Sequence, residues 1–279
     1  MRRPTGIAHK GIWLLAVALG MLLPAVAQAA PKTYVPNRTG DHAPNGCSAS
    51  DCTLREAVIA ANAHAGHDTI KLGAKTYTLA IPGTGEDAAA NGDLDLTQGV
   101  TIVGRGPSKT IVDGGGSSVG EAAFEVIAGG AQLAGITVRN SRSSSGDAGI
   151  TLRQGSSLHM SSARVVQNVV TSGGGNAGIQ AYDGTGADIT LRHVVVSGNS
   201  GGFCCAGVDT DASAILSHVT VAHNTSPDCC NGINAGGQKP GSGGRACDRH
   251  DQRGVKRPQG PRCDIGAYER KRHRRHHHH

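Results

Sequence analysis

The feature that most constrains the fold is a repeat in the second half of the chain. The segments "AGI", "AGI", "AGV" and "NGI" place glycine at positions 149, 178, 207 and 232, at intervals of 29, 29 and 25 residues. Between them, "LAGITVRN", "SSARVVQN", "RHVVVSGN" and "SHVTVAHN" end at Asn140, Asn168, Asn199 and Asn224. Fixed intervals of roughly 20 to 50 residues are typical of stacked repeat architectures.

The repeated unit has the pattern of short strands. Its apolar residues alternate with polar ones, which indicates β-strand. The closing Asn tolerates the left-handed conformation of a tight turn, and its amide can bond to the Asn of the coils above and below. No segment of helical length intervenes, so the repeats predict an all-β parallel β-helix in which neighbouring coils close the core.

The composition agrees with a solenoid. Glycine is abundant, at 42 of 279 residues, and the one tryptophan, Trp13, lies near the N-terminus. The core must therefore be built from small aliphatic side chains in thin layers, whereas a β-sandwich usually contains large core aromatics.

The first 29 residues have the organisation of a secretory signal peptide. Arg2, Arg3 and Lys10 precede the apolar run "GIWLLAVALGMLLPAVA", and "AQA" ends at Ala29. A retained membrane anchor is the alternative, which Pro24 and the small residues disfavour. No later segment approaches the roughly 20 apolar residues of a membrane span. We expect a secreted, extracellular or bacterial cell-surface protein, monomeric and without a transmembrane segment once mature.

The net charge of +6 comes from the two ends of the chain. The leader carries three positive charges and the tail "RKRHRRHHHH" carries five, so residues 30–269 carry −2. This balance argues against nucleic acid as a partner. The tail has three interpretations: a contact for anionic lipid or polysaccharide, a solvated charge run, or a histidine tag.

One segment predicts a helix. In "SDCTLREAVIAANAHAG", Thr53 and Glu56 form a capping box, Leu54 begins an apolar face and Gly66 ends the helix. A short helix before a solenoid can cover the open end of the first coil. Arg55 and Glu56 are therefore interpreted as structural.

The same segment, "DCTLREAVIAAN", resembles the motif of the CSLREA domain of secreted bacterial proteins, with Thr53 in place of the serine. The strands "DTIKL", "TYTL", "VTIVGRG", "TIVDGGG" and "LAGITVRN" also resemble that family, and "DQRGVKRPQGPRCDIGAYE" resembles the closing motif of choice-of-anchor Q proteins. The resemblance covers roughly residues 45–269. It implies a right-handed parallel β-helix of the pectate-lyase-like superfamily, exported and of undefined biochemistry. The short segment "NAGGQKPGSGGRACDRH" departs from the pattern, which puts the C-terminal seal in doubt.

These observations divide the chain into five parts: a signal peptide (1–29), an N-terminal cap (30–66), a parallel β-helix (67–237), a C-terminal choice-of-anchor-like segment (238–269) and a basic, histidine-rich tail (270–279).

Eight cysteines predict disulfides in an oxidising compartment. The vicinal pairs in "CCAGV" and "CCNGI" lie 25 residues apart, so equivalent cysteines of stacked coils fall within reach of a disulfide. Which cysteines pair is left open, and a metal site is the alternative, although the spacing differs from zinc knuckles. Two local bridges complete the set: Cys47 with Cys52 and Cys247 with Cys263, beside the two vicinal pairs Cys204, Cys205, Cys229 and Cys230.

The repeat alignment predicts a polar strip on the outside of the solenoid. Thr151, Gln180, Asp209 and Asn234 occupy one position of successive coils, with Arg153, Tyr182 and Asp211 two residues further on. This strip is interpreted as a solvated face, a glycan groove or a Ca²⁺ site. Arg153 has no evident carboxylate partner in the sequence. His193 and His218 are expected to stack; a metal site there would need a third ligand such as His223, so no metal centre is assigned to them. Candidate binding residues are Gln180, Tyr182, Asp183, Asp209, Asp211 and Asn234.

We therefore expect a non-catalytic surface protein that presents a face for adhesion, or for contact with the envelope or a polysaccharide. The alternative is a polysaccharide lyase or glycoside hydrolase that uses Asp209 and Asp211, with Ca²⁺ as its possible cofactor. A degenerate relative without a separate activity is the third interpretation.

Overall fold

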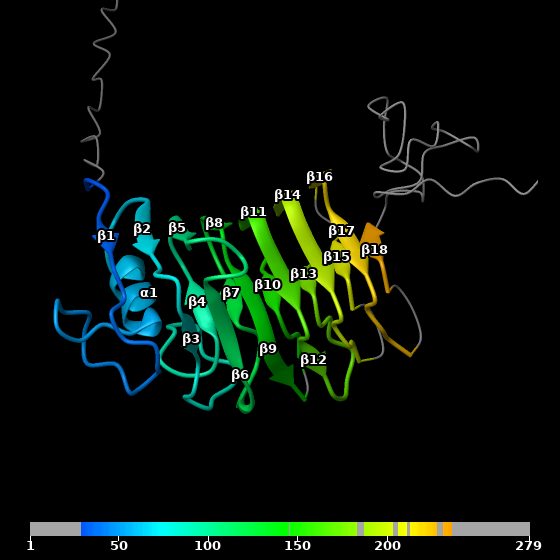
Figure 1. Cartoon of the computed structure of the whole chain (residues 1–279), viewed down its shortest axis with the longest axis horizontal. Coiled ribbons are helices and arrows are strands. Elements are labelled where there is room, and N and C mark those ends of the chain that lie inside the picture. The colour runs from blue at the N-terminus through cyan, green and yellow to red at the C-terminus, as the bar shows by residue number, and fades with distance from the viewer. Residues whose placement is uncertain are drawn as a thin grey trace, which may run out of the picture.

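The alternating segments form parallel strands that stack along one long axis, in a computed structural model of the chain (Figure 1). The structure describes residues 29–144, 146–182, 187–202, 206–210, 213–227 and 231–235. Its strands fall into two sheets, and every pairing between them is parallel. The predicted all-β parallel helix with a capping helix is confirmed.

The smaller sheet contains six short strands in spatial order, one from each successive coil. They are β4 (Leu94–Leu96), β7 (Phe124–Val126), β10 (Ile150–Leu152), β13 (Ile179–Ala181), β15 (Val208–Thr210) and β18 (Ile233–Ala235). The first and third residues of β4, β7, β10 and β13 are buried, whereas the middle residue points to the outer face. This sheet therefore carries the predicted outer strip.

The larger sheet contains twelve strands and forms the other two sides of the solenoid. They are β1 (Thr33–Tyr34), β2 (Asp68–Lys71), β3 (Thr76–Thr78), β5 (Val100–Val103), β6 (Ile111–Gly120), β8 (Gly130–Ala134), β9 (Thr137–Ser143), β11 (Ser157–Val166), β12 (Val169–Val170), β14 (Asp188–Ser197), β16 (Ser213–Ser217) and β17 (Thr220–Ala222). β11 pairs with β8 through its first half and with β9 through its second half, so one long strand turns the corner that two shorter strands turn in the preceding coil.

The repeated glycine is required because the coils approach closely there. The carbonyl oxygen of Gly178 accepts a hydrogen bond from Ile150 N–H at 3.0 Å, and the carbonyl of Gly207 accepts one from Ile179 N–H at 2.9 Å. A Cβ atom on Gly149 would lie 2.3 Å from Gly178 O, and one on Gly178 would lie 2.0 Å from Gly207 O. A side chain at either position would therefore push the coils apart.

The repeated asparagines form a buried ladder, as predicted. Asn168 Nδ2 and N–H both donate to Asn199 Oδ1 at 3.0 Å, and the same two groups of Asn199 donate to Asn224 Oδ1 at 3.0 Å. Asn199 Nδ2 also donates to Val165 O. The side chains satisfy backbone groups of the turn that no strand partner reaches.

The first member of the ladder was predicted wrongly, and the left-handed conformation expected of the closing Asn is confirmed at Asn140 but wrong at the three asparagines of the ladder. The strand register places Ser141, not Asn140, opposite Asn168. The left-handed residues stand one place earlier, at Asn140 (φ 57°), Gln167 (φ 58°) and His223 (φ 56°). Asn140 occupies the left-handed position that Gln167 occupies in the next coil, and Ser141 N–H, one residue later, donates to Asn168 Oδ1 at 3.0 Å.

The helix α1 (Leu54–Asn62) covers the N-terminal end of the stack and contacts β2 and β4 (Figure 1). Both halves of the predicted capping box are present between Thr53 and Glu56. The helix ends at Asn62 rather than at Gly66, because Ala63 already closes it and the chain turns before the glycine. The predicted cap is otherwise confirmed.

The predicted disulfide between Cys47 and Cys52 is present, and it closes the loop before α1. The other six cysteines, namely Cys204, Cys205, Cys229, Cys230, Cys247 and Cys263, lie outside the described residues, so their pairing stays a prediction. Val208 pairs with Ile233, which confirms the 25-residue offset of the strands that follow the two vicinal pairs.

Candidate functional site

The predicted polar strip is present and is longer than predicted. The register of the smaller sheet aligns one outward-facing residue from each of its six strands. We call this set the outer column: Asp95, Glu125, Thr151, Gln180, Asp209 and Asn234. Neighbouring strands lie about 4.8 Å apart, so the column is roughly 24 Å long.

The C-terminal half of the column contains three of the six binding residues predicted from the sequence. Gln180, Asp209 and Asn234 are partly exposed and adjacent in register. Asn234 Nδ2 donates to Asp209 Oδ1 at 2.7 Å, which fixes both side chains relative to the sheet. Tyr182 is 48% exposed and follows the end of β13. These four residues therefore lie on one accessible face.

Asp147 lies beneath this face and was not predicted as a site residue. Its carboxylate is 8% exposed and accepts from Asn176 N–H at 2.7 Å and from Thr151 Oγ1 at 3.4 Å. Burial is the main cause that raises the pKa of Asp147, and the charge of Asp209 adds to it. Burial and the neighbouring Asp147 likewise raise the pKa of Tyr182.

Two predicted site residues, Asp183 and Asp211, lie outside the described residues. Asp211 was one half of the catalytic pair proposed with Asp209. The separation of the two carboxylates, which would distinguish hydrolytic mechanisms, therefore stays a prediction.

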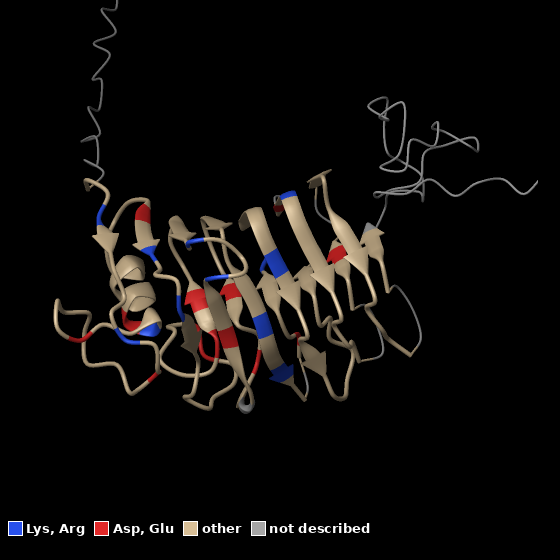
Figure 2. Ribbon diagram, viewed as in Figure 1, with Lys and Arg blue, Asp and Glu red and all other residues tan. Residues whose placement is uncertain are grey.

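The N-terminal half of the column is strongly acidic (Figure 2), and the sequence analysis missed it. Asp95 of β4 and Glu125 of β7 are paired in register, and one oxygen of each lies within 4.8 Å of an Asp87 oxygen. We call Asp87, Asp95 and Glu125 the acidic cluster. Asp93 and Glu121 lie near the cluster, and their carboxyl groups interact electrostatically with it.

A loop covering the outer face of β4 makes this cluster. Residues 82–92 fold back over the strand, and Ala89 N–H donates to Asp95 Oδ2 at 2.7 Å. The fully buried Arg55 holds the end of the loop, since its guanidinium donates to the carbonyl oxygens of Ala89 at 3.0 Å and Gly92 at 2.8 Å. Arg55 also forms an ion pair with Asp41 at 2.9 Å. This confirms a structural role for Arg55.

Arg153 pairs with two members of the cluster, which corrects the expectation that it lacked a carboxylate partner. Its guanidinium donates to both oxygens of Glu125, at 2.7 and 2.8 Å, and to both oxygens of Asp87, at 2.6 and 3.0 Å. Asp87 is 66 residues away in sequence. The repeat alignment could not reveal a partner supplied by a loop from an earlier coil.

The carboxyl groups around the acidic cluster are partly buried, and some of their oxygens lack hydrogen bonds. Burial, followed by the charges of Asp95, Glu121 and Glu125, raises the pKa of Asp93 to about 9. Burial also raises the pKa of Asp95 to about 7. Within the described part of the chain, the buried atoms Asp95 Oδ1 and Glu121 Oε2 have no hydrogen-bond partner. A cationic ligand or protons must therefore compensate these groups.

A sequence signal for the cluster was present in "DLDL" at residues 93–96. The two leucines alternate with Asp93 and Asp95, so both carboxylates point away from the core. The approach of Asp87 to the cluster could not be predicted from the sequence, because it depends on how the loop of residues 82–92 folds.

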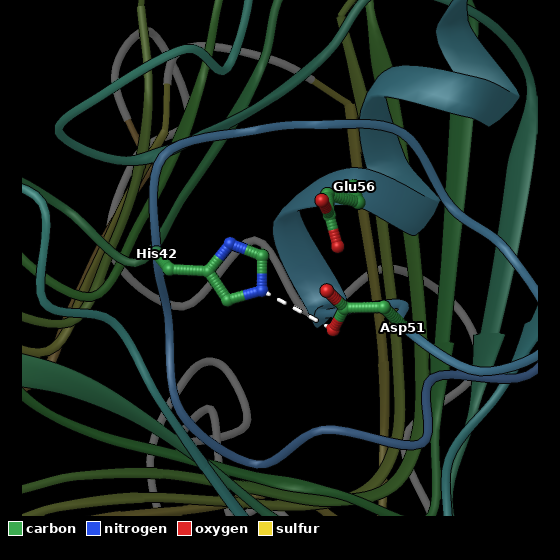
Figure 3. Close-up of side chains that lie close together, drawn as sticks. All are labelled: His42, Asp51 and Glu56. Atoms are coloured by element: carbon green, nitrogen blue, oxygen red, sulfur yellow. Dashed lines mark hydrogen bonds and ion pairs between the residues drawn. The ribbon is translucent and has the colours of Figure 1, made fainter.

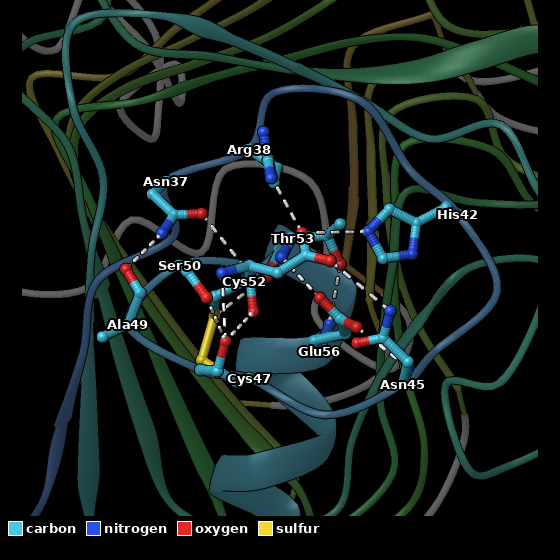
Figure 4. A network of polar contacts seen from close by, with 12 residues as sticks. Asn37, Arg38, His42, Asn45, Cys47, Ala49, Ser50, Cys52, Thr53 and Glu56 are labelled. Carbon is cyan, nitrogen blue, oxygen red and sulfur yellow. Dashed lines mark hydrogen bonds and ion pairs between the residues drawn. A yellow bond between two sulfur atoms is a disulfide. The ribbon is translucent and has the colours of Figure 1, made fainter.

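A second group of possible ligands lies before α1, where His42, Asp51 and Glu56 come together (Figure 3). His42 Nε2 lies 3.4 Å from Asp51 Oδ1. Glu56 Oε2 accepts from Thr53 N–H at 2.8 Å, and Glu56 Oε1 accepts from Asn45 N–H at 2.9 Å. Figure 4 shows that this network ties the loop to the helix start and lies beside the disulfide. We interpret it as a structural cap.

His193 and His218 stack, as predicted, with ring centroids 4.6 Å apart and an interplanar angle of 15°. Both residues have left-handed backbones, at φ 54° and 55°, and mark the corner within the larger sheet. The pair is therefore interpreted as part of the corner.

Among the described residues, no helix has both the length and the apolar composition required to cross a membrane. Comparisons with protein-family models, with curated proteins and with solved structures each find no match. The resemblance to CSLREA and choice-of-anchor Q proteins consequently stays a prediction, and the case for function is made by the outer column itself.

Proposed function

We propose that this is an exported, non-catalytic β-helix protein that binds an extended polysaccharide or cell-envelope glycan along its outer column. The observation that carries the proposal is the register of that column, whose C-terminal half presents Gln180, Asp209 and Asn234 at one side chain per coil. A polysaccharide is also a linear array of repeated polar units. A row of hydrogen-bonding side chains at a constant interval can contact successive sugar units.

The chemistry of the accessible half suits a neutral or hydroxyl-rich ligand. Gln180 offers an amide, Asp209 and Asn234 offer a paired carboxylate and amide, and Tyr182 offers an exposed ring. An aromatic ring with a polar tip can stack on the apolar face of a sugar. The secretion predicted from the N-terminus would bring this face into contact with envelope or extracellular glycans.

Cleavage of the glycan is the second candidate, and Asp147 is the observation that favours it. A carboxyl group with a raised pKa near a second carboxylate is the arrangement that general acid catalysis requires. Asp147 would then act as the proton donor and Asp209 as the second carboxylate, in place of the predicted pair with Asp211. Asp147 is largely covered, so binding without cleavage is the function we put first.

The test is a binding and cleavage assay on a panel of polysaccharides. We expect saturable binding by the oxidised protein, and a loss of about tenfold in affinity in Tyr182→Ala and in Gln180→Ala. His159→Ala is the matched control, since His159 is exposed on the larger sheet and should leave binding unchanged.

Two outcomes would change the proposal. Release of reducing or unsaturated sugar that is lost in Asp147→Asn or Asp209→Asn would make the protein an enzyme. Binding that His159→Ala weakens as much as Tyr182→Ala would move the glycan site away from the outer column.

A further inference from the structure

We propose that Asp87, Asp95 and Glu125 bind a divalent cation of the calcium type at the N-terminal end of the outer column. This proposal does not depend on glycan binding. It rests on the donor geometry, on a buried carboxylate oxygen without a partner, and on the covering loop that brings Asp87 to the sheet.

The donor geometry matches a large oxygen-preferring ion. One oxygen from each of the three carboxylates lies within 4.8 Å of the other two. Calcium binds oxygen at about 2.3 to 2.6 Å, so two ligands on opposite sides are separated by about 4.6 to 5.2 Å. One ion can therefore contact all three side chains without a large rearrangement. Magnesium demands near-ideal octahedral geometry and usually keeps several waters, so a group of protein carboxylates favours calcium.

The independent observation is the state of Asp95. Its side chain is fully buried, and Oδ2 accepts the Ala89 N–H, whereas Oδ1 has no hydrogen-bond partner among the residues that the structure describes. A buried carboxylate oxygen without a partner is costly, and Asp95 belongs to the group whose oxygens converge. A cation coordinated by Oδ1 would satisfy that oxygen.

Arg153 does not exclude the ion. It donates two hydrogen bonds to each of Asp87 and Glu125. A carboxylate offers about four lone-pair sites, so two remain on each side chain for a metal. Arg153 would then orient the two ligands from one side while the cation contacts them from the other.

The ligand type selects the ion. All three donors are carboxylates, which suit calcium, magnesium and manganese, whereas zinc prefers histidine and cysteine. The ion would join the loop to the strand, because the Asp87 side chain of the loop is 56% exposed while Asp95 of β4 beneath it is buried. Calcium would hold the loop of residues 82–92 on β4.

The experiment is calorimetric titration of CaCl₂ into the full chain after removal of metal by EDTA, with no glycan present. Calcium is the probe because the histidine run at residues 276–279 binds transition metals but not calcium. We expect one saturable site, with a Kd of about 10⁻³ M or tighter, and an increase in the melting temperature with calcium.

The variants separate this site from the glycan face. Asp95→Asn and Asp87→Asn should each weaken calcium binding at least tenfold, and Asp209→Asn, in the same column, should leave it unchanged. Asp87 lies in an exposed part of the loop, so Asp87→Asn reports on the site even if Asp95→Asn impairs folding. Absence of saturable binding to the unaltered protein would overturn the proposal, as would equal affinity in Asp87→Asn and the unaltered protein. Neither result bears on glycan binding.

Discussion

At the scale of single residues, the spacing of the coils is most sensitive to substitution at the repeated glycines. A Cβ on Gly178 would lie 2.0 Å from the carbonyl oxygen of Gly207, and the obstacle is backbone rather than a flexible side chain. The neighbouring coils are fixed by their own hydrogen bonds, so they cannot move apart locally. The glycine is therefore a packing requirement of the stack.

Gly178→Ala should lower the free energy of unfolding by about 2 to 3 kcal/mol, because overpacking against backbone costs at least as much as overpacking in a side-chain core. Chemical denaturation monitored by circular dichroism measures the change. Gly174→Ala is the matched control, because a Cβ at Gly174 meets nothing within 4 Å, and its effect should stay within about 0.5 kcal/mol. Equal stability of the two variants would contradict the close-packing argument.

Asp93 predicts a pH dependence of stability in calcium-free buffer. Its pKa rises from 3.8 to about 9, through burial and the charges of Asp95, Glu121 and Glu125. The folded protein thus keeps a proton that the unfolded chain releases. The contribution of Asp93 to stability is fully present below about pH 4, and it is lost as the pH rises toward 9.

The measurement is the melting temperature between pH 5 and pH 9 with EDTA present. We expect a decrease of several degrees for the unaltered protein and a flatter profile for Asp93→Asn, whose amide resembles the protonated acid. A melting temperature of the unaltered protein that rises over this interval would show that Asp93 does not carry the dependence.

At the scale of structural elements, the asparagine ladder fixes one corner of three successive coils. Asn199 is its centre: its amide donates to Val165 O and Asn224 Oδ1, and its oxygen accepts two bonds from Asn168. The coil that precedes the ladder has Ser141 in this position, and its buried Oγ finds no hydrogen-bond partner in the described ranges. The shorter side chain does not reproduce the asparagine contacts.

Asn199→Ala should destabilise the protein by about 3 kcal/mol, because it leaves buried backbone groups of two coils unsatisfied. Urea denaturation checks this value, with His159→Ala as a surface control that should change stability by less than about 0.5 kcal/mol. If Asn199→Ala proves as mild as the control, then water replaces the amide and the ladder is not a stabilising device.

At the scale of the whole molecule, the solenoid has one end covered by α1 and a body that extends coil by coil to β18 (Figure 1). Each coil buries little alone, so stability depends on the contacts between neighbours. Cross-links between adjacent coils would therefore stabilise the array beyond the short loop closed by Cys47 and Cys52.

We expect peptide mapping without reduction to find a disulfide joining one of Cys204 and Cys205 to one of Cys229 and Cys230. The sequence predicts it, and the pairing of Val208 with Ile233 supports the underlying offset. A cross-link that closes about 25 residues contributes about 3 kcal/mol, so reduction should lower the melting temperature by several degrees. Recovery of all four cysteines as free thiols from oxidised protein would reject the cross-link.

The sequence by itself determined the solenoid, the helix at its N-terminal end and the C-terminal half of the outer column. These features are periodic or local: glycine and asparagine recur at the coil interval, "TLRE" contains the capping box, and Gln180, Asp209 and Asn234 align once the interval is known. Alternation along each strand then decides which side chains face outward.

Only the tertiary structure decided the acidic cluster and the partners of Arg153. The loop of residues 82–92 is not part of the repeat, and its fold over β4 brings Asp87 to a strand that its sequence position does not suggest. The exact ladder register, with Ser141 in place of Asn140, also depended on backbone pairing. Periodicity determines contacts between equivalent positions of neighbouring coils, whereas contacts made by an inserted loop depend on the packing of that loop against the finished sheet.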